Sequence, residues 1–351
     1  MQTDVVLFGA APKEDEALLQ KAGKIIREGG LVAMPTETVY GLAGDALNPS
    51  SSEKIYAAKG RPSDNPLIVH IADMDSLQDI AVDIPDRAWK LADRFWPGPL
   101  TMILRKSALV PGETTGGLDT VAVRFPSHPA ARGLIKASGR PLAAPSANRS
   151  GRPSCTTASH VLEDMNGIIP LIIDGGTVGI GLESTIVDLT SDVPMLLRPG
   201  FIDVHTLEEI LGRISVDPSV NGLTDKSAHP KAPGMKYKHY APKGELCIVK
   251  GPEEKVVEAI NALSSEKERE GKKTAVIAAE ETASRYQCAL VRTIGSRSRE
   301  EEIARNLFQV LREMDDLGAD VIYTEEFDTP HLGMAIMNRL IRAAGHRIIR
   351  L

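Results

Sequence analysis

Hydroxyl-bearing and cationic side chains gather at five points in the first two hundred residues, each beside a short apolar run. In the first, PTETVYGL (35–42), Thr36 and Thr38 surround Glu37 just after the apolar run 31–34. The other four supply Lys59, Arg61, Thr120, Arg124, Ser146, Ser184 and Arg198. Arginine suits phosphate through paired N–H donors, and lysine acts as a point charge. This inventory favours a site for a polyanion with hydroxyl or zwitterionic parts, such as a nucleotide together with an amino acid.

Two pairs of these residues have spacings that indicate how their side chains are arranged. Lys59 and Arg61 lie two apart in a Gly/Pro loop after a predicted helix at 52–58, so both can reach one anion. The same pattern also fits a solvated basic turn. Thr120 and Arg124 lie four apart on a predicted strand and therefore share a face. An arginine among apolar neighbours needs an anionic partner, which can be a ligand or a structural carboxylate.

Several familiar catalytic motifs do not occur in the sequence. There is no GxSxG, no HExxH and no GxxxxGK[ST], so any ATP is not held by a P-loop. His70 lies inside the apolar run PLIVHI and by itself fits a core histidine. Ser146 and Asn148 could equally satisfy their own turn. Each signal is modest alone, and their combination supports the nucleotide and amino-acid interpretation.

Composition narrows the class of protein. With 351 residues, two domains are expected, and a net charge of -6 argues against a protein that coats nucleic acid. The rival interpretation, a non-catalytic RNA-binding protein with a cationic cavity, is disfavoured by this charge and by an aromatic content of 4%. Cys155, Cys247 and Cys288 form no CxxC pair, so neither a disulfide framework nor a metal site is expected, and a cytoplasmic protein fits best. The N-terminus has neither a signal peptide pattern nor a membrane-spanning stretch.

The chain changes character near residue 213. From residue 15 to about 210, helical patterns alternate with short apolar runs, which predicts an α/β or α+β domain with many strands. Residues 213–243 are rich in Pro, Gly, Lys and His and lack apolar periodicity, as a linker or functional loop would. Residues 244–351 alternate strand and helix patterns and predict a small parallel sheet. We therefore expect domains at 1–212 and 244–351, joined by the segment 213–243.

Seven stretches of the first domain occur in an order that resembles the YrdC/Sua5 family of L-threonylcarbamoyladenylate synthases. They are PTETVYGL, KGRPSDNPLIVHI, FWPGPLT, DTVAVRFP, PLAAPSANRSGRPS, ESTIVD and LLRPG, and the resemblance covers about residues 15–205. The linker sequence KYKHYAP and the region after it resemble the longer, two-domain Sua5 form. This resemblance implies a YrdC-like twisted open sheet with a large concave cavity, followed by a smaller Rossmann-like domain.

The resemblance also implies a reaction. L-threonine, bicarbonate and ATP, with Mg²⁺, would give threonylcarbamoyl-AMP and pyrophosphate. A downstream tRNA threonylcarbamoyl transferase would then modify adenosine 37 of tRNAs that read ANN codons, and the enzyme itself would not need to contact tRNA. A carbamoyl transferase of hydrogenase maturation, which contains a related domain, is disfavoured because acylphosphatase-like and zinc-finger segments are missing.

The resemblance to the family motifs also implies roles for individual residues. Lys59 and Arg61 are the expected catalytic cations. The residues expected around L-threonine are Thr38, His70, Arg124, Ala144 and Ser184. The residues expected around ATP are Arg61, Asn65, Thr120, Ser146, Ser154 and Arg198, with Tyr237 from a linker that folds over the cavity as a lid. Tyr240 is an alternative to Tyr237. The role of Glu37 stays open between pairing with Lys59 or Arg61 and assisting the substrate amine.

Overall fold

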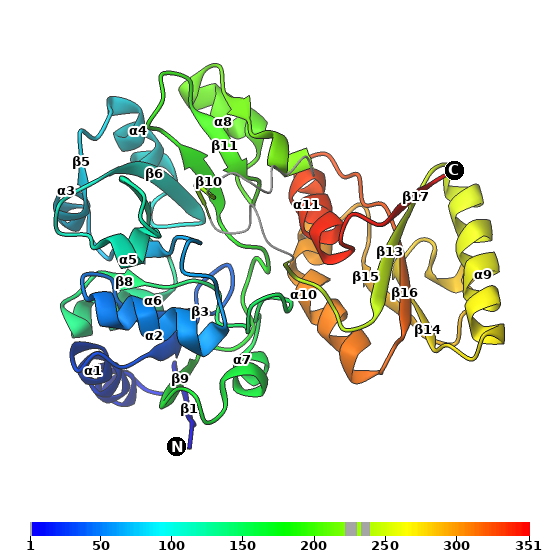
Figure 1. Ribbon diagram of the computed structural model, residues 1–351, viewed down its shortest axis with the longest axis horizontal. Coiled ribbons are helices and arrows are strands. Elements are labelled where there is room, and N and C mark those ends of the chain that lie inside the picture. Colours follow the sequence, from blue (N-terminus) through cyan, green and yellow to red (C-terminus); the bar gives the residue numbers. More distant parts are fainter. Residues whose placement is uncertain (1, 222–229, 233–238) are drawn as a thin grey trace. The chain divides into compact units, whose positions relative to one another are not determined.

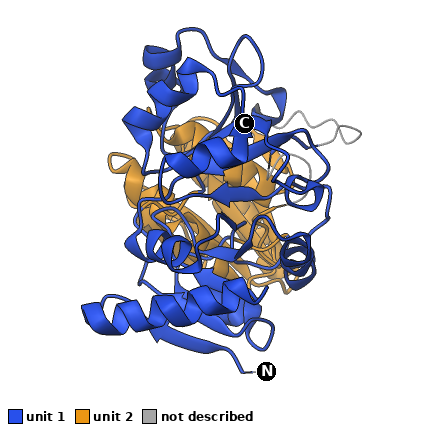
Figure 2. Ribbon diagram, turned by 90° about the vertical axis from the view of Figure 1, so that its left-hand side faces the viewer, with its two compact units in different colours: residues 1–150, 154–179, 183–236 blue, residues 151–153, 180–182, 237–351 orange. Residues whose placement is uncertain are grey.

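The computed structural model describes residues 2–221, 230–232 and 239–351. Tyr237 lies outside the described residues. The chain forms two compact units, which Figure 2 shows in different colours. The first unit comprises Met1–Ser150, Ser154–Gly179 and Glu183–Lys236. The second comprises Gly151–Pro153, Ile180–Leu182 and Tyr237–Leu351, so two short loop segments group with the C-terminal residues.

Among the described residues, the first unit builds one twisted twelve-stranded sheet with helices around it (Figure 1). The strand order is β1-β9-β2-β3-β8-β4-β7-β6-β10-β11-β12, and β5 pairs with β6. The strands are β1 Asp4–Leu7, β2 Val32–Met34, β3 Gly41–Asp45, β4 Ile68–His70, β5 Ala81–Val82, β6 Leu100–Lys106, β7 Thr120–Arg124, β8 Leu142–Ala143, β9 Leu171–Asp174, β10 Thr185–Asp188, β11 Met195–Arg198 and β12 Ser215–Val216. The helices are α1 Pro12–Arg27, α2 Pro49–Lys59, α3 Asp75–Ile80, α4 Asp86–Phe95, α5 Gly112–Thr115, α6 Pro129–Ser138, α7 Ala158–Met165 and α8 Val204–Leu211, followed by the short 3-10 helix Pro218–Asn221.

Helix α1 shows how local sequence sets these elements. A proline begins the helix, acidic residues occupy its first turn and basic residues its last, which complements the helix dipole. Leu18, Ala22 and Ile26 recur every four residues and are buried against the sheet. Gly29 then adopts a left-handed φ of 75°, which ends the helix and starts the turn into β2.

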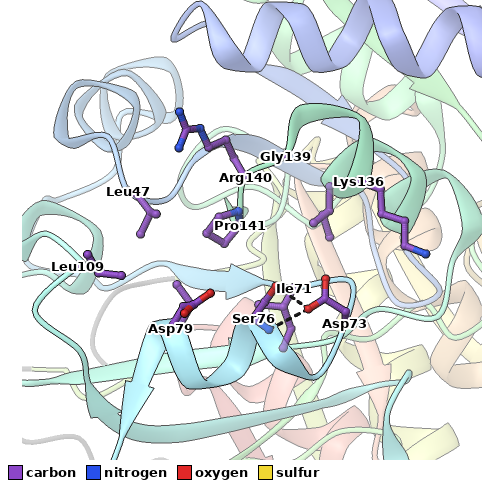
Figure 3. Close-up of a pocket in the computed structure, with 12 residues that line it drawn as sticks. Leu47, Ile71, Asp73, Ser76, Asp79, Leu109, Lys136, Gly139, Arg140 and Pro141 are labelled. Carbon is purple, nitrogen blue, oxygen red and sulfur yellow. Dashed lines mark hydrogen bonds between the residues drawn. The ribbon is translucent and has the colours of Figure 1, made fainter.

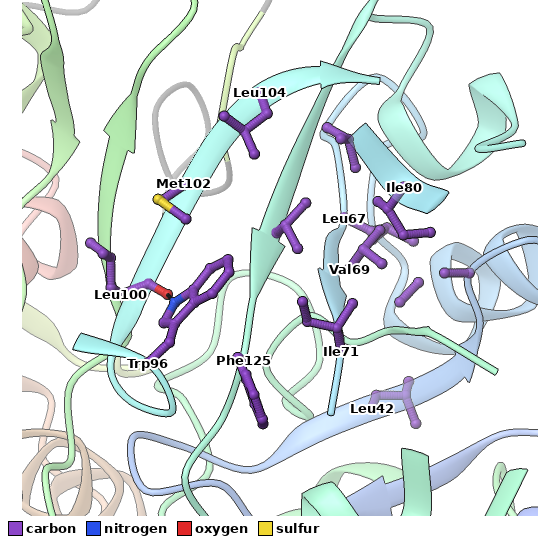
Figure 4. Close-up of a cluster of buried hydrophobic side chains, with 14 of the residues drawn as sticks. Leu42, Leu67, Val69, Ile71, Ile80, Trp96, Leu100, Met102, Leu104 and Phe125 are labelled. Carbon is purple, nitrogen blue, oxygen red and sulfur yellow. Dashed lines mark hydrogen bonds between the residues drawn. The ribbon is translucent and has the colours of Figure 1, made fainter. Parts of the chain in front are cut away.

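The two faces of the central strands have different partners. Val121 and Val123 of β7 pack with Val69 and Met102 in a large apolar core, part of which Figure 4 shows. Because side chains alternate along a strand, Arg124 of β7 projects from the opposite face. This separation of β7 into an apolar and a polar face agrees with the sequence pattern. It leaves the second face of the sheet available for polar chemistry.

The second unit forms a separate, all-parallel sheet of five strands within the described part of the chain, in the order β15-β14-β16-β13-β17. Its strands are β13 Glu245–Lys250, β14 Thr274–Ala279, β15 Val291–Gly295, β16 Val321–Glu325 and β17 Ile348–Arg350, and its helices are α9 Glu253–Arg269, α10 Glu300–Asp316 and α11 Gly333–Ala343, with the 3-10 turn Ala283–Arg285. The mixed α/β fold with a second, parallel-sheet region was predicted, and it is confirmed. No described helix combines the length and apolar character that crossing a bilayer requires.

Candidate functional site

A row of buried polar side chains crosses the central sheet of the first unit. The registers place His70 of β4 beside Arg124 of β7, and Arg124 beside Thr101 of β6. The Thr101 and Ser184 hydroxyl oxygens lie 2.7 Å apart. Arg198 of β11 continues the row, since its Nη2 donates to Ser184 Oγ (3.1 Å) and its Nε to the Ser184 carbonyl (3.0 Å). Residues from five parts of the sequence thus form this polar row.

Arg124 has a structural carboxylate as its neighbour. Its Nη2 lies 2.7 Å from Oε1 of Glu37, and the two side chains are 5% and 15% exposed. The Ser127 amide donates to the other carboxylate oxygen, at 3.2 Å. Burial, the largest single influence, would raise the pKa of Glu37. The charge and hydrogen bond of Arg124, together with the backbone amides of Glu37 and Ser127, outweigh it and hold the pKa below its ordinary value. Glu37 therefore pairs with Arg124 rather than with Lys59 or Arg61, the partners considered from the sequence.

This ion pair yields a first prediction. Replacing Glu37 with Gln should lower the free energy of unfolding of the ligand-free protein by about 3 kcal/mol, because it leaves the buried Arg124 charge without its counter-ion. The family resemblance implies that the carboxylate of L-threonine binds at Arg124. If it does, it would supply the missing negative charge, and L-threonine should raise the melting temperature of Glu37→Gln more than that of the wild type. Differential scanning fluorimetry with and without L-threonine measures both effects. Equal shifts in the two proteins would contradict the prediction.

His70 is held neutral by its surroundings. Burial, followed by the charge of Arg124, lowers the pKa of its imidazole to about 3. Its Nδ1 lies 3.0 Å from the carbonyl oxygen of Ile68, so the neutral ring donates there from Nδ1. A neutral histidine leaves Arg124 as the positive charge at this end of the row.

The KGRP loop is folded tightly after α2. Lys59 ends the helix, is buried, and donates from Nζ to the carbonyl oxygens of Ser146 and Asn148. Arg61 donates to the carbonyls of Asn65 (3.2 Å) and Pro66 (3.0 Å). Lys59 thus links this loop to the loop after β8, whereas a solvated basic turn would leave it exposed.

The buried position of Lys59 should make the folding stability of the protein depend on pH. Burial, with a contribution from the charge of Arg61, lowers the pKa of Lys59 from its ordinary value of 10.5 to about 7. The unfolded chain therefore binds this proton more tightly than the folded one, and folding stability should rise with pH from about 7 towards 10.5. Lys59→Met should lose this rise, which urea unfolding at neutral and alkaline pH would measure. The same slope in both proteins would show that other groups cause it.

Local hydrogen bonds order the stretch from Thr36 to Tyr40. Oγ1 of Thr36 accepts the amides of Thr38 and Val39, both at 3.2 Å, and lies 2.9 Å from the Thr38 hydroxyl oxygen. Tyr40 is fully buried, and its hydroxyl donates to the Gly176 carbonyl at 2.7 Å. Thr36 and Tyr40 thus have structural partners, and Thr36 orients the Thr38 hydroxyl.

The other described residues expected in the site are Asn65, Thr120, Ala144, Ser146 and Ser154. Ser154 is fully buried and donates to Glu183 Oε1 at 2.5 Å, and Asn65 Oδ1 is buried with no hydrogen-bond partner among the described residues. Such an orphan acceptor calls for a ligand or a water. Thr120 is half-buried and lies four residues from Arg124, or roughly 13 Å along the strand. Ala144 and Ser146 follow β8, where Ala144 donates its amide to the Ile68 carbonyl and Ser146 bridges to Gly41.

Two polar residues of the site, Thr101 and Glu183, were not predicted from the sequence. Thr101 could have been found by the argument used for Arg124, because it alternates with the buried Leu100 and Met102 on its strand. Glu183 stands directly before Ser184 but lies 29 residues from its partner Ser154, and no local pattern reveals that contact.

A separate cavity of about 580 Å³ lies elsewhere in the first unit, and Figure 3 shows the side chains around it. Its walls combine apolar residues such as Leu47 and Ile71 with charged residues such as Asp73, Lys136 and Arg140. Asp73 already accepts two hydrogen bonds from Ser76. None of the expected site residues lines this cavity, so it is distinct from the polar row.

Comparison with known proteins decides the family. One family model, described as Telomere recombination and named Sua5_yciO_yrdC, matches residues 24–200. A second, described as Threonylcarbamoyl-AMP synthase, C-terminal domain, matches residues 202–345. The chain belongs to the two-domain Sua5 family.

Individual members of the Sua5 family align along almost the whole chain. The threonylcarbamoyl-AMP synthase of Pyrococcus abyssi is 50% identical over 345 residues, covering 98% of this chain and 99% of the relative. That of Bacillus subtilis is 48% identical over 334 residues, covering 95% and 94%. The crystal structure of Pyrococcus abyssi Sua5 complexed with L-threonine matches with a TM-score of 0.94 and 50% identity, covering 99% of this chain and all of that one.

Proposed function

We propose that this protein is a threonylcarbamoyl-AMP synthase that uses L-threonine, bicarbonate and ATP and releases pyrophosphate. The observation that carries the proposal is the buried row from His70 through Arg124 and Ser184 to Arg198, in a chain similar over its full length to enzymes of that name. A relative of almost identical fold has been solved with L-threonine bound. The row offers one cation, Arg124, for an amino-acid carboxylate and a second, Arg198, for phosphates.

The chemistry needs no covalent nucleophile. The neutral amine of threonine forms a C–N bond with the carbon of bicarbonate, and water leaves. A carbamate oxygen then attacks the α-phosphorus of ATP, and pyrophosphate departs with the electron pair of the broken P–O bond. The protein contributes by holding two anions together and neutralising charge on the leaving group. Buried arginines suit this task because they stay charged.

The predicted site residues fit these two substrates as follows. We assign L-threonine to Thr38, His70, Arg124, Ala144 and Ser184, and ATP to Arg61, Asn65, Thr120, Ser146, Ser154 and Arg198, with Lys59 and Arg61 as the catalytic cations. The orphan acceptor of Asn65 and the ordered hydroxyl of Thr38 support the assignment. Lys59 supports catalysis by fixing the loop that carries Ser146.

We assign residues 1–212 to the catalytic domain, 213–243 to a lid and 244–351 to the C-terminal domain. Of the described residues in the lid, 213–221, 230–232 and 239–243, the stretch 230–232 supports its role. Ala232 is fully buried and packs with Ile68 and Ala122, which alternate with core residues of β4 and β7 and so face the same side as Arg124. A cover on this face would keep water from the carbamoyl adenylate, which hydrolyses readily.

We assign Mg²⁺ to the ATP rather than to a protein cage. The described residues contain no group of three or more histidine, cysteine or acidic side chains that could hold a metal. Mg²⁺ commonly keeps several waters and binds through substrate phosphates with few protein ligands. It would then supply charge neutralisation on the phosphates, in addition to that of the arginines.

The product is an activated acyl donor and therefore needs an acceptor enzyme. We propose a downstream tRNA threonylcarbamoyl transferase as that partner, with no requirement for this protein to contact tRNA. A cytoplasmic setting agrees with the three cysteines, all of which are free thiols.

The test is pyrophosphate release from ATP in the presence and absence of each co-substrate. We expect release that requires both L-threonine and bicarbonate. Salt-sensitive RNA binding with no such turnover would overturn the proposal in favour of an RNA-binding protein.

A further inference from the structure

Helix α10 of the second unit has one face to which separate parts of the chain attach. Residues 305, 308, 312 and 315 recur every three or four positions and therefore lie on one side of the helix. Figure 2 shows this unit in orange. Within the unit, the loop segments 151–153 and 180–182 and the stretch 239–243 contact that side of the helix. The face formed by these four positions is called the α10 face below.

The strongest attachment is made by a buried arginine. Arg312 is 2% exposed, and its Nη2 donates to the carbonyl oxygen of Pro153 at 2.7 Å. On the same segment, the carbonyl of Gly151 accepts the amide of Ala241 at 2.8 Å. Tyr240 in turn stacks on Phe308 of the α10 face, with ring centroids 5.1 Å apart. Segment 151–153 is thus held at both of its ends.

The second loop segment approaches the helix backbone. A Cβ added to Gly181 would lie 2.4 Å from the Cα of Arg305, and the glycine has a φ of +83°. A side chain at position 181 would meet helix backbone, which cannot move aside as a flexible side chain would. At the far end of the same face, Asp315 accepts the amide of Lys243 at 2.6 Å. The α10 face thus fixes three segments that are distant in sequence.

The chain neighbours of the two loop segments are residues of the proposed nucleotide site. Pro153 is followed directly by Ser154, and Leu182 is followed directly by Glu183 and Ser184. Ser154 and Glu183 are joined by their 2.5 Å hydrogen bond, and Ser184 accepts from Arg198. Because Ser154, Glu183 and Ser184 are one or two residues from these segments, a displacement of either segment would also move them.

We propose that the α10 face positions the nucleotide half of the site, with Arg312 and Gly181 as its positioning residues. Neither residue touches the substrates in this account: Arg312 fixes Ser154 through Pro153, and Gly181 lets the chain approach α10 closely enough to place Glu183. The assignment of Ser154 and Arg198 to ATP rests on the proposed function. The second unit would then contribute to catalysis by holding these two loop segments in place.

Kinetics of Arg312→Lys provide the first test. Lysine keeps the charge but lacks the planar fork of donors that reaches the carbonyl of Pro153. We expect KM for ATP to rise by roughly tenfold or more, with KM for L-threonine changed less than about twofold. Arg292→Lys is the matched control, because Arg292 lies in the same unit in an exposed 3.8 Å pair with Glu313. It should leave both constants unchanged.

Amide hydrogen exchange supplies a readout that does not depend on activity. We expect Arg312→Lys to speed exchange at residues 150–155 while the melting temperature stays close to that of the wild type. Gly181→Ala should give the same selective rise in KM for ATP, with faster exchange near residue 183. The inference would be overturned if both substitutions raised the KM values for ATP and L-threonine equally. It would also be overturned if neither substitution changed KM or hydrogen exchange. A wild-type protein without threonine-dependent turnover would instead overturn the proposed function, and exchange would still test Arg312.

Discussion

Replacing Arg124 with alanine is expected to weaken L-threonine binding by roughly 30- to 150-fold and to change ATP binding by less than about threefold. The Arg124 side chain is 5% exposed and lies in the polar row between His70 and Thr101. A hydrogen bond to a charged group contributes about 2 to 3 kcal/mol, and each 1.36 kcal/mol corresponds to roughly a factor of ten in affinity. Isothermal titration calorimetry with each ligand separately measures the two affinities.

The same substitution also removes the partner of Glu37, so its effect on folding must be separated from its effect on binding. Arg124→Ala/Glu37→Gln serves as the control, because it removes the carboxylate charge that the single substitution would leave buried. If the loss of L-threonine affinity persists in this double variant, Arg124 acts on the ligand directly. Equal losses for L-threonine and ATP would show that Arg124 is structural or serves both ligands.

Replacing Lys59 with methionine is expected to lower kcat/KM for ATP by roughly 100- to 1,000-fold, the range found when one preorganised donor of an active site is removed. Methionine fills similar space but cannot donate to the carbonyls of Ser146 and Asn148, so the loop after β8 loses its link to α2. Steady-state kinetics at saturating L-threonine and bicarbonate measure this loss.

Helix α2 provides a matched control for that experiment. Lys54 also donates to a backbone carbonyl, that of Gly29 at 2.7 Å, but it lies outside the polar row and both loops. Lys54→Met should therefore keep the activity. A comparable fall in both variants would mean that general destabilisation of α2, rather than the loop link, explains the effect.

Much of the fold could be predicted from local patterns. The alternation of Val121 and Val123 with Thr120 and Arg124 determined which face of β7 is polar, because strand geometry repeats every two residues. This inference depends only on neighbours in sequence, and the structure confirms it.

Long-range pairings could not be predicted in this way. Glu37 and Arg124 are 87 residues apart, and the polarity of each gave no reason to prefer this pairing over Lys59 or Arg61. The grouping of residues 151–153 and 180–182 with the C-terminal unit was also hidden, because it depends on single contacts to α10. Which of the row's residues contact L-threonine and which contact ATP stays a prediction.

In the proposed reaction, one site joins an amino acid, bicarbonate and a nucleotide. This can be tested by mass spectrometry after incubation with ATP, L-threonine and carbon-13-labelled bicarbonate. We predict a threonylcarbamoyl adenylate that carries the label in its carbamoyl carbon and forms only when all three substrates are present. Arg124→Ala should strongly reduce its formation at L-threonine concentrations that half-saturate the wild type. Release of AMP and pyrophosphate without a labelled adenylate, or without dependence on L-threonine, would contradict the account.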